Sequence, residues 1–328
     1  MTVTLCVPVY NGEGAIGRCL DSIARACDEG HDVEVIVVDN ASSDRTVAVA
    51  EAQLRAFRRA RVVRNERNLG RIANWNRCLE LAEGDWVKLL MVNDTLLPRS
   101  LHCLAAEAER DADVVMVCSM HHSWDGGEPP LAAADCAASR RRYARLEALE
   151  AVAGGVDPFW ALNGALFRRQ AIATAGLRFD EALPYLTDKV FMAQLSTHGT
   201  TVFLETPTYL FNTGAAGRFH YQALASEGYF REVREFYRFI GERTRPGDAA
   251  FVDSRVFASF LSSCYETSVP ISPQAVRAAF PGSVLRRGVA TGVLAARAAH
   301  LDVRPSAWRR AAARTFPGLR KAWRWIRS

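Results

Sequence analysis

The stretch "VEVIVVD", residues 33–39, decides the fold expected for this chain. It is rich in β-branched apolar residues and ends in a single aspartate. Such a pattern is typical of a strand in a parallel sheet that is covered on both faces. The stretch "TLCVPVY" (4–10) has the same character, and a helical pattern over 14–27 separates the two. The chain is therefore expected to begin with a β-α-β unit.

Strands and helices continue to alternate beyond this unit. Further strands are expected at 60–65, 85–92 and 113–119, and helices at 45–60 and 71–84. This rhythm predicts an α/β fold, with a doubly wound, mostly parallel sheet and helices on both faces. Ligands of such sheets bind at the carboxyl ends of the strands.

The chain is expected to consist of two regions. Residues 120–145 have the composition of a loop or insertion, and a second α/β portion follows them. After about residue 220 the pattern is helical and prolines divide it into five or six helices. We therefore predict an α/β domain over 1–220 and a helical C-terminal region over 221–328.

Composition places the chain among globular proteins. Of its 328 residues, 49% are hydrophobic and 23% are charged. The excess of Ala and Arg indicates a GC-rich bacterial genome. No run of about 18 apolar residues occurs, so no membrane span is predicted. The eight cysteines form no CxxC pair and are predicted to be reduced core residues, which favours a cytoplasmic location.

Positive charge is concentrated at the C-terminal end. Residues 283–328 contain eleven Arg or Lys and one acid, a net charge of +10, whereas the rest of the chain carries −5. "WRRAAARTFPGLRKAWRWIRS" (308–328) interleaves aromatic residues with arginines, as in helices that lie on anionic membranes. The alternative is a helix docked on the core with a solvated basic face. Nucleic-acid binding is not expected, because no recognition motif accompanies the charge.

Three predicted strand ends deliver polar residues to one edge of the sheet. They are "PVYNGE" (8–13), "VVDNASSDRT" (37–46) and "MVND" (91–94). A carboxylate at such a strand end can accept hydrogen bonds from a base N–H or from ribose hydroxyls. Asp39 stands at that position, and Asp44 is suited to capping the next helix. Ordinary turns after each strand are the alternative interpretation.

These segments, together with "NLGRIANWNRCLELAEGDWVKLL" (68–90) and "NDTLLP" (93–98), resemble family 2 glycosyltransferases of the GT-A fold in order and spacing. The resemblance is strong over residues 3–120 and weaker to about 212. It implies an inverting transferase that moves a sugar from a UDP- or dTDP-sugar to a hydroxyl acceptor, such as a glycan, a lipid-linked saccharide or a natural product. Residues 1–120 would form the nucleotide-sugar-binding half and 121–220 the acceptor half.

The resemblance also implies roles for residues on the nucleotide side. Tyr10 would stack on the base, Asp39 would hydrogen-bond to it, and Arg71 would neutralise the diphosphate. A solvated helix residue is the alternative for Arg71. The complete nucleotide-sugar set is Pro8, Tyr10, Asn11, Asp39, Asn68, Gly70, Arg71 and Asn93. Asn76 matches a family asparagine that is expected to be structural.

"MVND" falls where the family carries an acidic metal motif, yet Asp94 is its one acid. Mg²⁺ commonly uses one or two carboxylates, with water and phosphates completing its shell. We therefore expect Mg²⁺ or Mn²⁺ at Asp94, with Asn93 as a neutral oxygen ligand. Where a late histidine sometimes completes such sites, this chain has Asn212 and Thr213, and His220 follows somewhat later.

Acceptor chemistry is assigned by the same resemblance. In "PYLTDKVFMAQL" (184–195), Thr187 replaces the first acid of a family pair and Asp188 is retained as the general base. An ordinary helix cap is the alternative for Asp188. Trp160, Asn163 and Gly164 match the wall on the acceptor side.

Two other functions stay open from the sequence. A catalytically degenerate nucleotide-sugar-binding or scaffold protein is suggested by the missing acids at 91–93 and 187. A sugar-phosphate nucleotidyltransferase would want a Gly-rich, Arg-containing phosphate loop after the first strand, which "YNGEGAIGR" (10–18) fits poorly. The expected location is cytoplasmic, with the tail as an option for peripheral contact at the inner face of the membrane.

Overall fold

The computed structural model describes residues 1–27, 32–125, 127, 129, 132–159, 161–214 and 226–266. The chain divides into two compact units, Met1–Arg218 and Phe219–Ser328.

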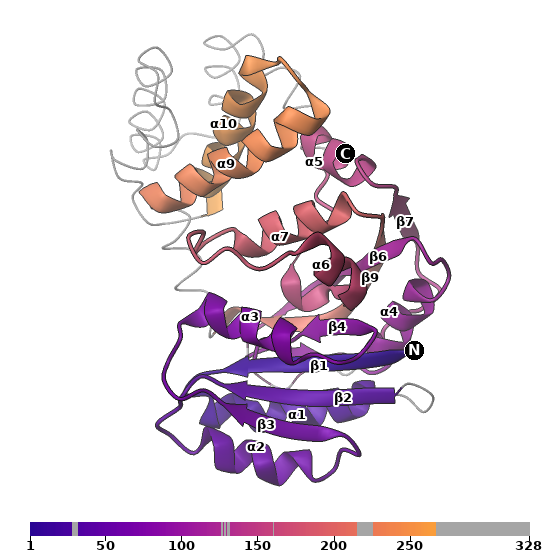
Figure 1. Ribbon diagram of the computed structural model, residues 1–328, viewed down its shortest axis with the longest axis vertical. Helices are drawn as coiled ribbons and strands as arrows, with labels where there is room; N and C mark the ends of the chain where they lie inside the picture. The colour runs from indigo at the N-terminus through magenta and orange to yellow at the C-terminus, as the bar shows by residue number, and fades with distance from the viewer. Residues whose placement is uncertain are drawn as a thin grey trace. The chain divides into compact units, whose positions relative to one another are not determined.

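One mixed, mostly parallel sheet forms the centre of the first unit (Figure 1). Its strands are β1 (Thr2–Val9), β2 (Asp32–Asp39), β3 (Ala60–Arg64), β4 (Trp86–Leu89), β5 (Thr95–Leu96), β6 (Val114–Trp124), β7 (Arg140–Tyr143), β8 (Leu166–Arg168) and β9 (Thr200–Asn212). The strand order is β3-β2-β1-β4-β8-β6-β9-β5, and β7 pairs with β9 off this path. β1, β2, β3 and β4 pair in parallel, as do β6 and β9. β8 runs antiparallel between β4 and β6.

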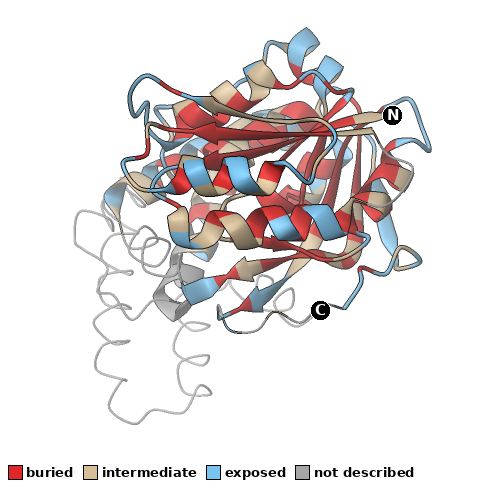
Figure 2. Ribbon diagram, turned by 90° about the horizontal axis from the view of Figure 1, so that it is seen from below, coloured by how far each residue is buried: buried red, intermediate tan, exposed pale blue. Residues whose placement is uncertain are grey.

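Helices cover both faces of this sheet (Figure 1). They are α1 (Glu13–Ala26), α2 (Thr46–Leu54), α3 (Arg71–Leu81), α4 (Ser100–Ala108), α5 (Glu147–Gly154), α6 (Arg169–Ala175) and α7 (Thr187–Ser196). Leu5 and Val7 of β1 pack in one core cluster with Ile16 and Leu20 of α1. Cys6 points to the other face, where its thiol donates to the Cys78 carbonyl of α3. Apart from β3 and β7, the strands are buried along most of their length (Figure 2), and the predicted fold class is confirmed.

The expectation of a loop or insertion over 120–145 was wrong at both of its ends. β6 continues to Trp124, and Arg140–Tyr143 form β7. Both depend on β9, whose thirteen residues pair with β6 as far as Asn212 and also with β7. A partner strand whose paired residues lie 58 to 88 positions further along the chain is not visible in the local pattern. Helix α4 was also missing from the elements expected from sequence.

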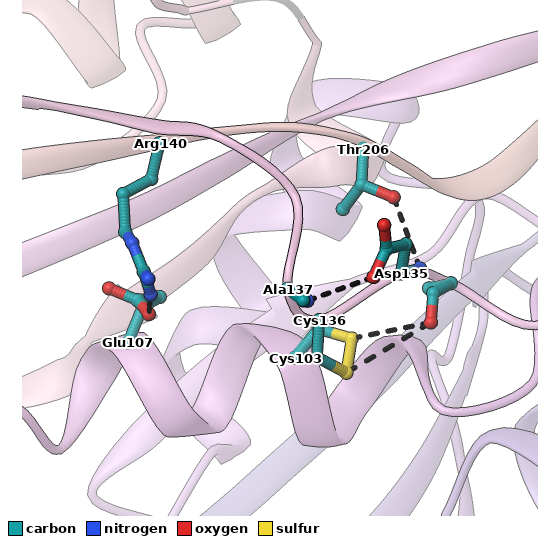
Figure 3. The surroundings of a disulfide bond; sticks show 8 residues. Cys103, Glu107, Asp135, Cys136, Ala137, Arg140 and Thr206 are labelled. Atoms are coloured by element: carbon teal, nitrogen blue, oxygen red, sulfur yellow. Dashed lines mark hydrogen bonds and ion pairs between the residues drawn. A yellow bond between two sulfur atoms is a disulfide. The ribbon is translucent and has the colours of Figure 1, made fainter.

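The prediction that all cysteines are reduced was wrong for two of them. Cys103 of α4 and Cys136 form a disulfide, with their Cα atoms 4.8 Å apart (Figure 3). The chain returns over α4 after 33 residues, so the pairing follows from tertiary structure and not from a spacing motif. The backbone N–H of Ala134 donates to Pro98 O and thereby holds the same segment. Because these two cysteines are paired, the cysteine content no longer supports the expected cytoplasmic location.

The second unit is described over two helices. They are α9 (Glu227–Thr244) and α10 (Ala249–Glu266), and they pack against each other. Phe230, Val233, Phe236 and Ile240 recur at helical spacing and are buried. None of the helices in the described ranges is long and apolar enough to cross a membrane. The further helices expected from the prolines and the basic segment 283–328 lie outside the described residues.

Candidate active site

The loops that follow β1 and β2 are tied together at the carboxyl edge of the sheet. Asn11 adopts a left-handed conformation with φ 49°. Its backbone N–H donates to Ser42 Oγ, and its Oδ1 accepts from the Ser43 N–H, both at 2.8 Å. Pro8 is buried within β1, whereas the Tyr10 side chain is 51% exposed. Asn11 and Pro8 thus build the loop that presents an aromatic ring to solvent.

Asp39 ends β2 with a fully buried side chain. Its Oδ2 accepts from the Ser42 N–H at 3.1 Å and lies 3.4 Å from Arg64 Nε. Its Oδ1 is buried and has no hydrogen-bond partner in the described part of the chain. Buried acceptors are normally satisfied, and leaving one unpaired costs about 1–3 kcal/mol. This oxygen is therefore suited to an N–H donor of a ligand.

A network of neutral amides supports the start of α3. Asn40 Nδ2 donates to Asn68 Oδ1 at 2.8 Å, and Asn65 Nδ2 donates to both Asn40 and Asn74. Asn68 Oδ1 also accepts from the N–H of Gly70, whose φ of 87° favours glycine. Asn68 and Gly70 are therefore framework residues that place the first residue of α3. Asn40, Asn65 and Asn74 were not predicted as site residues, because their pattern is that of ordinary turn residues.

Arg71 is that first residue, and it reaches across the site. Its Nη2 donates to the carbonyl oxygen of Pro184, in the segment just before α7. Its guanidinium carbon lies 5.0 Å from the centroid of the Trp75 ring. The positive charge is also close enough to Asp188 to lower the pKa of that carboxyl. Arg71 thus joins the α3 side of the site to the segment that carries Asp188.

The "MVND" turn buries its acid. The Asp94 N–H donates to Met91 O at 2.9 Å, and the Asp94 side chain is only 3% exposed. Its Oδ1 accepts from the Asn212 N–H at 2.9 Å, and its Oδ2 accepts from Asn163 Nδ2. Burial raises the pKa of Asp94 to about 7 despite these two hydrogen bonds. Asn93 is half-buried in the same turn.

These surroundings fit a single cation. No cationic side chain of the described residues pairs with Asp94. Within the same ranges, no cluster of three or more His, Cys, Asp or Glu side chains occurs that could hold a metal. A desolvated carboxylate without a counter-charge is stabilised by a cation, and Mg²⁺ accepts phosphate and water as its other ligands. At the position where a late histidine sometimes completes such sites, Asn212 at the end of β9 donates its backbone N–H to Asp94. His220 lies outside the described residues.

Asp188 is the second residue of α7 and is half-buried. Its Oδ1 accepts from the Lys189 N–H at 2.9 Å, so it also serves the helix terminus. Burial raises the pKa of Asp188, and the charges of Lys189 and Arg71 only partly oppose this effect. A carboxyl with a raised pKa is the better general base near neutral pH. Beside it, Thr187 Oγ1 is buried without a partner in the described part of the chain.

Tyr209 of β9, which the sequence analysis missed, marks where these parts meet. Burial raises the pKa of its hydroxyl, and both Asp94 and Asp188 raise it further. The charges of both carboxylates therefore act on the Tyr209 hydroxyl. The Tyr209 hydroxyl is 3.4 Å from His121 Nδ1. A tyrosine inside an apolar strand pattern gives no signal of this position.

The residues expected on the acceptor side differ from one another in their surroundings. Asn163 is buried in η1 (Leu162–Gly164), and its amide contacts the "MVND" turn. A Cβ on Gly164 would lie 2.8 Å from Ser119 O and 3.2 Å from the Tyr209 ring, so glycine permits this close approach. Trp160 lies outside the described residues. Asn76 exchanges hydrogen bonds with the backbone of Phe179, as expected of a structural residue.

Comparison with known proteins adds the family. The family model described as Glycosyl transferase family 2 matches residues 4–174. A Mycobacterium tuberculosis protein, MT1568, is 31% identical over 220 residues, which are 62% of this chain and 64% of that protein. The chain spans between about half and two thirds of the length of this and two further curated relatives, and less of several others.

Two solved structures share the fold. S. aureus TarS 1-349 in complex with UDP-GlcNAc has a TM-score of 0.58 and 18% identity, over 85% of this chain and 79% of TarS 1-349. The mannosyltransferase PcManGT from Pyrobaculum calidifontis, in complex with GDP-Man and Mn²⁺, also has a TM-score of 0.58 and 18% identity. That match covers 94% of this chain and 81% of PcManGT. The predicted GT-A architecture is confirmed by these likenesses.

Proposed function

Because the chain belongs to glycosyl transferase family 2, we propose that it moves a sugar, with inversion, from a nucleotide-diphospho-sugar to a hydroxyl acceptor. The observation that carries this proposal is the unpaired, buried Oδ1 of Asp39 at the end of β2, together with the exposed ring of Tyr10, which follows the neighbouring strand β1. The N3–H of uracil or thymine is the donor that this oxygen lacks, and the phenol ring can stack on the base. UDP- and dTDP-sugars are therefore the favoured donors, and the UDP-GlcNAc bound by TarS supports this choice.

The proposed transfer step uses Asp188, Arg71 and Asp94. The acceptor hydroxyl attacks C1 of the sugar while Asp188 takes its proton, and the bond from C1 to the diphosphate oxygen breaks. Attack opposite the leaving group inverts the configuration at C1. The guanidinium of Arg71 stabilises the departing diphosphate. Mg²⁺ or Mn²⁺, held by Asp94 with Asn93 beside it, would supply further positive charge at the diphosphate, and the Mn²⁺ of PcManGT supports this assignment.

The remaining assignments concern organisation and partners. We propose a catalytic domain over 1–220, with 1–120 binding the donor and 121–220 the acceptor, and a helical region over 221–328. The acceptor is a glycan, a lipid-linked saccharide or a natural product. The basic segment 308–328 would contact anionic membrane from the cytoplasmic side. Loss of sedimentation with anionic liposomes after deletion of residues beyond 305 tests this contact, and unchanged sedimentation contradicts it.

A donor panel tests the proposed function. The full chain is incubated with UDP-, dTDP- and GDP-sugars in Mn²⁺, and release of the nucleoside diphosphate is measured without and with saccharide acceptors. We expect turnover of a UDP- or dTDP-sugar. Binding of these donors without any turnover would favour a scaffold protein. Formation of a nucleotide-sugar from a sugar phosphate and a nucleoside triphosphate would favour a nucleotidyltransferase.

A further inference from the structure

A lysine lies at the centre of the sheet. Lys88 of β4 is fully buried, between β1 and β8. Its ammonium pairs with no carboxylate of the described residues. Nζ donates instead to two backbone carbonyl oxygens, those of Asn163 and, at 3.3 Å, Ala165. These carbonyls belong to η1 and to the residue that follows it.

Such a lysine does not serve the stability of the sheet. An ammonium without a paired charge is expensive to bury, and the burial lowers the pKa of Lys88 to about 7. An apolar side chain of similar length would fill the same position in the strand, and replacing buried charges in this way is often neutral or stabilising. The lysine is therefore best explained by what its two hydrogen bonds hold in place.

They hold the turn that carries Asn163. The Asn163 amide is fixed at both ends, because its Oδ1 accepts from the Met91 N–H at 2.9 Å and its Nδ2 donates to Asp94. Ser119 Oγ donates to the carbonyl of Gly164 at 3.0 Å and anchors the same turn from β6. A continuous path of hydrogen bonds thus runs from Lys88 through η1 to the Asp94 carboxylate.

We propose that Lys88 and Asn163 are positioning residues for Asp94. Lys88 holds η1 in place, and the Asn163 amide then orients both the Asp94 carboxylate and the "MVND" turn toward the donor diphosphate. The inference rests on the proposed role of Asp94 at the diphosphate. It explains how a turn with one acid can suffice, since a single ligand must be held in the productive geometry by its supporting contacts. Both residues would act through Asp94.

Two substitutions, Lys88→Met and Asn163→Ala, test this proposal on the full chain. For each variant, kcat and KM for donor hydrolysis, the affinity for UDP in Mn²⁺ and the thermal midpoint are measured. We expect roughly a 10²-fold loss of kcat for each, the usual effect of a misplaced catalytic group. Lys88→Met should keep or raise the thermal midpoint. Glu107→Gln is the matched control, because Glu107 is another buried charge, on α4, that pairs with Arg110 and Arg140. It should lower the midpoint and leave kcat unchanged.

A second background separates positioning from general packing. In the Asp94→Asn background, Lys88→Met and Asn163→Ala should leave the affinity for UDP in Mn²⁺ unchanged, because both act through the Asp94 carboxylate. Equal losses of affinity in the parent and in Asp94→Asn would overturn the proposal, as would a parental kcat for both single variants. Should Lys88→Met fail to fold, Asn163→Ala carries the same comparison. If the parent itself binds Mn²⁺ and UDP without turning over any donor, the proposed function fails, and the affinity measurements still test the positioning.

Discussion

The two ends of the donor site are held together in different ways. At the nucleotide end, Asn11 hydrogen-bonds Ser42 and Ser43, which are 31 and 32 positions away in the sequence. The asparagine network before α3 joins residues that are 9 to 28 positions apart. At the transfer end, Asp94 depends on Asn163 and Asn212, 69 and 118 positions away. The nucleotide end is thus built within successive β-α-β units, whereas the transfer end exists only after the second half of the unit has folded against the first.

The largest effect is expected at the transfer end. Asp188→Asn should lower turnover by roughly 10²–10⁴, the usual worth of a general base, because an amide cannot take the acceptor proton. The affinity for UDP should stay near that of the parent, since the nucleotide end is built separately. Steady-state hydrolysis and calorimetry with UDP measure the two quantities. Asp180→Asn, in the exposed turn before α7, is the matched control. More than about half of the parental activity in Asp188→Asn would reduce Asp188 to a helix cap.

Coupling between metal and nucleotide gives the next largest effect. With one acid at the turn, Mn²⁺ should bind weakly to the protein alone, and Mn²⁺ and UDP should strengthen each other's binding reciprocally, by about 5–150-fold. Asp94→Ala should remove this coupling and most of the activity. Asn93→Ala should do less, since water replaces a neutral ligand, and Asn93→Asp should tighten Mn²⁺ binding. Calorimetry of Mn²⁺ with and without UDP measures the coupling. Full turnover in excess EDTA would exclude a metal at Asp94.

At the nucleotide end we expect a smaller effect that is confined to binding. Asp39→Asn should weaken UDP binding by roughly tenfold, because it replaces a charged acceptor for the base N–H, worth about 1.5–3 kcal/mol, by a neutral one, worth about 0.5–1.5 kcal/mol. The kcat at saturating donor should change little. Asp32→Asn, at the other end of the same strand, removes an ion pair with Arg59 instead, and it should bind UDP as the parent does. A loss of kcat in Asp39→Asn without loss of affinity would contradict the separation of the two ends.

The smallest effect concerns stability and pH. Burial lowers the pKa of Lys88 from 10.5 to about 7 in the folded protein, so the unfolded chain binds an extra proton between these values. Stability of the parent should therefore rise with pH across that window, relative to Lys88→Met. The variant's advantage, a few degrees in thermal midpoint, should be greatest below pH 7 and shrink toward pH 10. Urea unfolding at pH 6, 8 and 10 measures the difference. An advantage that is independent of pH would mean that Lys88 is charged to the same extent in both states.

The same comparison shows what sequence can predict here. Strand and helix periodicity identified the sheet, and the strand ends pointed to Tyr10 and Asp39, because both signals are local. Asp94 and Asp188 were assigned through resemblance to a family, and their roles stay predictions. Tyr209 and Lys88 were not singled out, because they stand in strand patterns and their partners lie in other segments.

Long-range contacts also explain the other errors. The extension of β6, β7 and the Cys103–Cys136 disulfide each require a partner from 33 to 88 residues away. The hydrogen bond from the Asn163 amide to Asp94 likewise joins residues 69 positions apart, and the acceptor-side role that the family resemblance implies for Asn163 stays a prediction.

A crystal structure of the parent with UDP and Mn²⁺ tests the central claim most directly. We expect the uracil ring to stack on Tyr10 and to donate its N3–H to Asp39 Oδ1. The diphosphate should lie between Arg71 and a Mn²⁺ held by Asp94. UDP bound elsewhere, or bound here with Asp39 Oδ1 still unpaired and the diphosphate remote from Asp94, would contradict it.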